Sequence, residues 1–72
     1  MKLNYYPDTD SLYIDLSDQT SVESREISEG VVLDYDAKGN VVGIDIDNAS
    51  EKVELQKLTV SKLPGRVETT AG

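Results

Sequence analysis

The stretch LNYYPDTDSLYIDL, residues 3–16, decides the fold of this chain. Apolar and polar residues alternate on both sides of a Pro-Asp-Thr-Asp run, and this period is typical of strands that bury one face. For the two strands to present their apolar residues on one face, Tyr5 must lie opposite Leu12. The four intervening loop residues then carry Pro7 at the second position of a type I turn. The stretch therefore predicts an antiparallel hairpin.

A second hairpin is predicted from VVLDYDAKGNVVGIDID, residues 31–47. The same reasoning places Tyr35 opposite Val42 and leaves residues 37–40 as another four-residue loop. Gly39 in this loop is able to adopt a positive φ angle. Two hairpins of equal loop length are thus expected from the alternation alone.

A further strand over residues 22–27, polar on both faces, would be joined to the second hairpin by residues 28–30 and a bulge. We therefore expect an α+β, mainly β fold: an antiparallel meander of about five short strands with a short C-terminal helix on its apolar face. Residues 1–63 are predicted to form this single domain, and residues 64–72 a flexible C-terminal tail.

The helix is predicted after residue 47, where the period of the sequence changes. Asn48 followed three residues later by Glu51 resembles a capping box. A helix over residues 51–58 would lay Leu55 and Leu58 on the apolar face of the sheet. Apolar residues also alternate locally in this segment, so a strand-like or irregular structure is the alternative.

The composition argues against several kinds of site and partner. The 72 residues suffice for one domain, and they include no Cys and no His, so neither a disulfide nor a zinc-type site is available. The net charge of −7, from 14 acidic and 7 basic residues, argues against binding to nucleic acid or to an anionic membrane. It favours a basic protein as partner. The first ten residues lack the apolar run of a signal peptide, and we expect a cytoplasmic protein.

Two stretches in combination resemble a known family. YYPDTDSLYIDLSD, followed by SREISEGVVLDYDAKGNVVGIDIDNAS, is similar to the short prokaryotic proteins of DUF2283, a domain of unknown function. The shared pattern is a Tyr-x-Pro-acid start, an apolar LYI strand, an acid-Gly-Val turn and a GNVVGI hairpin that ends in NAS. The resemblance covers residues 3–50 and implies a β-meander followed by a helix. It implies no catalytic residues, and toxin-like neighbours suspected for some members point to a binding role.

One segment mimics a calcium-binding loop. Residues 34–40 with Asp45 place oxygen donors at the first, third and twelfth positions and a Gly at the sixth. Lys38 stands where a fifth-position oxygen is needed, and the flanking segments are predicted strands rather than helices. We therefore interpret the segment as a hairpin turn. In the alternative interpretation, Asp34, Asp36 and Asp45 are the candidate ligands for a hard cation such as Mg²⁺ or Ca²⁺.

The predicted register also gathers an acidic and tyrosine-bearing surface on the outward face of the sheet. The candidate interaction residues on this face are Tyr6, Tyr13, Val32, Asp34, Val41 and Asp45. Tyrosine is enriched at the centres of protein interfaces, where its ring is buried and its hydroxyl finds a partner.

No His, Cys or Arg cluster accompanies the carboxylates, so we expect no enzyme and no cofactor. The predicted function is a non-enzymatic protein-interaction or self-associating module. A small divalent-cation or ligand-binding protein is the first alternative, and an antitoxin-like partner of a basic protein is the second.

Overall fold

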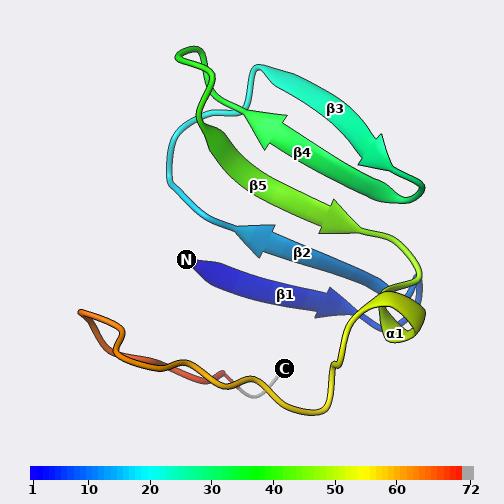
Figure 1. Ribbon diagram of the computed structural model, residues 1–72, viewed down its shortest axis with the longest axis vertical. Helices are drawn as coiled ribbons and strands as arrows, with labels where there is room; N and C mark the ends of the chain where they lie inside the picture. The colour runs from blue at the N-terminus through cyan, green and yellow to red at the C-terminus, as the bar shows by residue number, and fades with distance from the viewer. Residues whose placement is uncertain (71–72) are drawn as a thin grey trace.

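The computed structural model describes residues 1–70, which form one five-stranded antiparallel sheet with a single turn of helix beside it (Figure 1). The elements are β1 (Lys2–Tyr6), β2 (Ser11–Asp15), β3 (Glu23–Ser28), β4 (Val31–Tyr35), β5 (Val41–Ile46) and α1 (Ala49–Lys52). The predicted mainly β architecture with a short C-terminal helix is confirmed. The strands, however, are ordered β1-β2-β5-β4-β3 and are not strictly sequential.

The strand order follows from the polarity of the strands. β5 is the most buried strand and lies at the centre, where it pairs with β2 on one side and β4 on the other. β3 is exposed at every position and takes an edge, where half of its backbone groups face solvent. The chain between β2 and β3 passes the ends of the central strands to reach that edge (Figure 1).

The first hairpin has the predicted geometry. Tyr5 lies opposite Leu12, and Tyr6 and Ser11 flank the four-residue loop. The Thr9 N–H donates to the Tyr6 carbonyl at 3.3 Å, so Pro7 stands at the second position of a four-residue turn, as expected.

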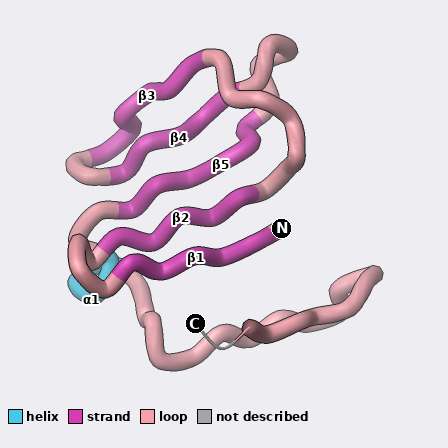
Figure 2. The backbone as a smooth tube through the Cα atoms, turned by 180° about the vertical axis from the view of Figure 1, so that it is seen from behind, coloured by secondary structure: helices cyan, strands magenta, loops and turns pink. Residues whose placement is uncertain are grey.

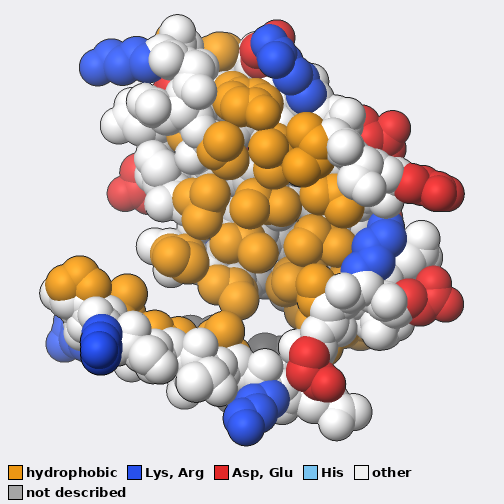
Figure 3. Space-filling view, in the orientation of Figure 1, with side chains coloured by type: hydrophobic (Ala, Val, Ile, Leu, Met, Phe, Trp, Pro, Cys, Tyr) orange, Lys and Arg blue, Asp and Glu red, His pale blue; other side chains and the backbone are white. Residues whose placement is uncertain are grey.

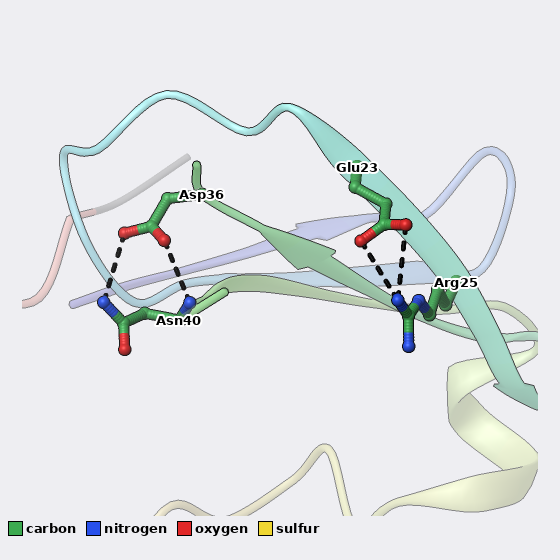
Figure 4. Close-up of polar contacts among 4 residues, drawn as sticks. All are labelled: Glu23, Arg25, Asp36 and Asn40. Carbon is green, nitrogen blue, oxygen red and sulfur yellow. Dashed lines mark hydrogen bonds and ion pairs between the residues drawn. The ribbon is translucent and has the colours of Figure 1, made fainter. Parts of the chain in front are cut away.

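The second hairpin departs from the prediction by one residue at its tip. A bulge in β5 places Tyr35 opposite Val41 instead of Val42. The Asp36 N–H donates to the Asn40 carbonyl at 2.9 Å, which shortens the loop to three residues with Gly39 at φ 83°. The Asp36 carboxylate explains the shortening, because its Oδ1 accepts the Lys38 and Asn40 N–H groups at 2.9 Å each. Figure 4 shows the contact with Asn40.

β3 is also displaced by one residue, from the predicted 22–27 to Glu23–Ser28. The expected bulge lies inside the strand, between Glu26 and Ser28, so that only Glu29 and Gly30 form the turn into β4. Gly30 adopts φ 71°, as a tight turn at this point requires.

The predicted helix over residues 51–58 is wrong in its extent. α1 has four residues and begins at Ala49; Asn48 has a left-handed backbone (φ 51°) and makes no side-chain capping bond. No helix or strand is present from residue 53 to residue 70, and Leu58 is 66% exposed instead of packed on the sheet. Isolated helices this short are unstable without a packed face, and the Leu55–Leu58 pair alone is too narrow an apolar stripe to supply one.

The C-terminal segment, which we define as residues 53–70, runs past the β1 edge of the sheet (Figures 1 and 2). The domain limit at residue 63 and the flexibility of residues 64–70 stay predictions, and residues 71–72 of the predicted tail lie outside the described residues. None of the helices in residues 1–70 has the length and apolar character needed to cross a membrane.

The two faces of the sheet differ sharply in composition. The apolar face consists of Leu3, Tyr5, Leu12, Ile14, Val31, Leu33, Tyr35, Val42, Ile44 and Ile46. Figure 3 shows hydrophobic side chains gathered into one continuous patch over the sheet. Among the described residues only Leu12, Val42 and Ala49 are buried apolar residues, so this face is largely uncovered.

Candidate functional site

The polar face of the sheet carries most of the predicted interaction residues. The register aligns Tyr13 with Asp45 and Asp45 with Val32, and it places Asp34 one row away, opposite Gly43. Tyr6, which is 52% exposed, follows at the end of β1. Val41 is the exception: the bulge sets it opposite Tyr35 of the apolar face, so strict alternation no longer assigns it to the polar face.

A hydrogen-bonded chain crosses four strands on this face. The Tyr13 hydroxyl, from β2, donates to Asp34 Oδ2 at 2.8 Å, and Ser24 Oγ, from β3, donates to Asp34 Oδ1 at 2.6 Å. Between them, the Tyr13 side chain lies across Gly43 of β5, where a Cβ atom would stand 2.7 Å from Tyr13 Cζ. Glycine at position 43 is therefore what allows the tyrosine to reach β4. Tyr13 and Asp34, which the sequence predicts as binding residues, thus bond to one another within the sheet, a contact that the sequence did not predict.

The electrostatics of the face reflect its concentration of acids. The hydrogen bond to Asp34 is the main cause that raises the pKa of Tyr13 to about 12, with burial and the neighbouring carboxylates adding to it. Partial burial raises the pKa of Asp45 from its ordinary value, and the charges of Asp47 and Asp34 raise it further. The ion pairs within residues 1–70 join Arg25 to Glu23 and Arg66 to Glu68, so neither involves an acid of this face. Within residues 1–70 the acids of the polar face therefore form no ion pair, although Lys2 lies opposite Asp15 on the same face.

The candidate metal ligands do not come together. Asp36 turns its carboxylate into its own loop, where it accepts backbone N–H groups and contacts the Asn40 amide at 3.4 Å (Figure 4). Across the described part of the chain, no group of three or more acidic side chains is arranged to hold a metal ion. Two shallow depressions, one beside Met1 and Lys2 and one between the β3–β4 turn and α1, are lined by neither Asp34 nor Asp45.

A cluster around Asp10 was missed by sequence reasoning. Asp10 has φ 52°, its carbonyl accepts the Ala49 N–H at 2.8 Å, and its carboxylate accepts both the N–H and the hydroxyl of Ser50, at 3.0 and 2.7 Å. The Tyr5 hydroxyl donates to the same carboxylate at 2.7 Å. These bonds, that of Ser50 first, lower the pKa of Asp10. The two halves of the cluster, the PDTD loop and the NAS segment, lie 40 residues apart in the sequence, and the apolar period does not indicate that they meet.

The cluster explains why α1 forms where it does. Asp10 satisfies the first N–H groups of the helix in place of the predicted Asn48 side chain, and Ala49 is fully buried. At the other end, Lys52 Nζ donates to the carbonyls of Asp47 and Glu29 at 2.7 and 2.9 Å. These bonds hold α1 at one end of the sheet, where it does not cover the apolar face.

The apolar face is accordingly a second candidate interaction surface. Leu3 and Tyr5 on the β1 side are each 43% exposed, although both stand in rows of apolar neighbours. At the β3 margin, the Arg25 guanidinium carbon lies 5.5 Å from the centre of the Tyr35 ring. A guanidinium nitrogen of Arg25 pairs with Glu23 Oε2 at 3.3 Å (Figure 4). A surface of this kind on a single-layer sheet is typical of a face that meets another layer.

Comparison with known proteins matches the part of the chain that contains the sheet. The model of DUF2283, described as a protein of unknown function, matches residues 2–50, which include all five strands and the first residues of α1. No curated protein and no solved structure was found to match the chain. The matched segment begins in β1 and ends at Ser50, so it contains both halves of the Asp10 cluster. The chain belongs to the DUF2283 family.

Proposed function

We propose that this protein is a non-enzymatic interaction module that binds its partner through the apolar face of the sheet. The main support for the proposal is that the apolar face is a continuous hydrophobic surface with no second layer over it in the described chain (Figure 3). Burial of apolar area contributes about 25 cal/mol per Å², so covering this face supplies a strong driving force for association.

The hydrogen bonds within the polar face also favour binding through the apolar face. Tyr13 and Asp34 are engaged with one another and with Ser24, and breaking these bonds would oppose binding. On the apolar face only the two tyrosines have polar contacts, Tyr5 with Asp10 and Tyr35 with Arg25. Its Leu and Ile side chains gain only from being covered.

A second candidate function, binding of a basic protein to the polar face, is favoured by one specific observation. Partial burial raises the pKa of Asp45, and the charges of the neighbouring Asp47 and Asp34 raise it further. A cationic side chain from a partner would relieve this repulsion. This candidate includes the antitoxin-like role.

Site-specific photo-crosslinking in cells tests the two surfaces against one another. A benzophenone side chain is placed at Leu3 on the apolar face, at Tyr6 on the polar face, or at Lys38 in the β4–β5 loop as a control. We expect adducts from Leu3 above the Lys38 background. Adducts from Tyr6 alone would favour the basic-partner function, and background yields at both faces would contradict an interaction role.

A further inference from the structure

We propose that the occupant of the apolar face is the same face of a second copy of this chain, so that two sheets pack into a sandwich. The inference rests on the proposed function, because it names the partner of the surface assigned there. The two polar faces would then point outward on opposite sides of the dimer. Such a contact is self-complementary about a two-fold axis.

The small core of the single chain is the first argument. Three buried apolar residues in the described chain, Leu12, Val42 and Ala49, are few for a domain of this size. Small domains add a disulfide, a metal or a partner subunit when their core is thin, and this sequence has neither Cys nor His. A second copy would cover the apolar face, on which only Leu12 and Val42 are buried in the described chain, and would turn it into a shared core between two sheets about 10 Å apart.

The accessible surface is the second argument. The chain exposes 5956 Å². A compact monomer of 7.9 kDa is expected to expose about 4,400 Å², so the excess is about 1,500 Å². A standard interface buries about 800 Å² from each partner. The C-terminal segment, which has no helix or strand, contributes to this excess, and so does the apolar face, on which Leu3 and Tyr5 are each 43% exposed.

The distribution of charge is the third argument, and it selects a second copy over a basic partner. In the rows of the apolar face the charged residues are Arg25 and Glu23 at the β3 margin, and these two pair with one another. The net charge of −7 therefore lies away from this face. Two copies can meet here without bringing uncompensated charges into contact, whereas the one acid available to a basic partner, Glu23, is already paired with Arg25.

Sedimentation equilibrium and thermal unfolding of the full chain test the proposal directly. Between about 5 µM and about 500 µM we expect the average mass to rise towards twice the 7.9 kDa of one chain. The midpoint of unfolding should rise by ~10 °C over the same range, since folding and association are linked. A mass of one chain and a constant midpoint throughout would overturn the proposal.

A matched pair of variants on β1 separates face-to-face packing from pairing of strand edges. Leu3→Glu adds a charge to the apolar face, and Asn4→Glu adds the same charge to the opposite face of the same strand. We expect Leu3→Glu to weaken dimerisation at least ~10-fold and Asn4→Glu to change it less than ~3-fold. Equal effects of the two variants would indicate edge pairing and overturn the proposal.

Salt supplies an independent readout that does not depend on any variant. Higher salt screens the repulsion between two chains of charge −7, so dimerisation through apolar faces should strengthen or stay constant. Dimerisation that weakens with salt would overturn it. A monomeric chain that still forms Leu3 adducts with a different protein would refute the second copy alone, and a monomeric chain without adducts would refute the proposed function as well.

Discussion

The Gly43→Ala substitution tests the hydrogen-bonded chain on the polar face. Because the Tyr13 side chain lies across Gly43, with its Cζ atom 2.7 Å from where a Cβ would stand, an alanine methyl must displace the ring. The displacement breaks the 2.8 Å bond from the Tyr13 hydroxyl to Asp34. Alanine in a strand is otherwise preferred over glycine, so without the tyrosine the same substitution should stabilise.

The magnitude follows from three opposing contributions. Forcing a side chain from a packed position costs about 1–3 kcal/mol, and a hydrogen bond to a charged acceptor contributes about 1.5–3 kcal/mol. Water partly replaces the lost hydrogen bond once the Tyr13 hydroxyl is displaced, which reduces the hydrogen-bond contribution. Replacing glycine in a strand stabilises by about 0.5–1 kcal/mol. We expect a net loss of about 2 kcal/mol in the free energy of unfolding, which lowers the melting temperature by ~10 °C.

A double-mutant cycle with Tyr13→Ala supplies the decisive comparison, read by denaturant unfolding at one fixed protein concentration. In the Tyr13→Ala background, Gly43→Ala should be neutral or stabilising by up to about 1 kcal/mol. Gly65→Ala is the matched control, because nothing lies within 4 Å of its Cβ position, and it should leave stability unchanged. Equal destabilisation by Gly43→Ala in both backgrounds would refute the reasoning.

Three further predictions concern titratable groups of the fold. The pKa of Tyr13 is raised to about 12, so its bond to Asp34 stabilises the fold fully below pH 10, and this stabilisation is lost as the pH rises towards 12. Tyr13→Phe should remove the late step from the tyrosinate absorbance titration. The pKa of Asp45 is raised, so its charged form destabilises the fold at neutral pH. Asp45→Asn should therefore stabilise by about 0.2–1 kcal/mol at pH 7 in thermal unfolding, a gain that must vanish below the ordinary pKa of 3.8. The pKa of Asp10 is lowered chiefly by Ser50, so the stability it contributes is present above its ordinary pKa and lost as the pH falls through the lowered value; Ser50→Ala should move the acid-unfolding midpoint, followed by circular dichroism, to higher pH, and an unchanged midpoint would contradict the cluster.

The hairpins could be predicted from the sequence because their apolar period determines which residues face one another. Tyr5 lies opposite Leu12 as the alternation requires. The bulge that moves Tyr35 opposite Val41 could not be predicted in this way, since one extra residue leaves the period on either side unchanged. The local cause, the Asp36 carboxylate that closes a three-residue loop, is a side-chain effect outside any periodic pattern.

The arrangement of the hairpins and the candidate site required long-range information. The placement of β5 between β2 and β4 decides that Tyr13 can reach Asp34, and nothing local in the sequence specifies that pairing. The helix was misplaced for a related reason: its first N–H groups are satisfied by Asp10, far away in the chain, rather than by an adjacent cap. The outward position of the acids follows from register, whereas the ion pairs within residues 1–70 depend on side-chain positions that the sequence pattern does not specify.

The seam between β2 and β5 has a consequence for how the chain folds. Each hairpin closes over a short loop, whereas Leu12 and Ile46, which face one another across the seam, are brought together only by closing a long loop. We expect the two hairpins to form early and the seam to form last, as the slow step. Amide hydrogen exchange should therefore find that the seam opens as a unit and separates the intact β1–β2 hairpin from the intact three-stranded β3–β4–β5 part of the sheet.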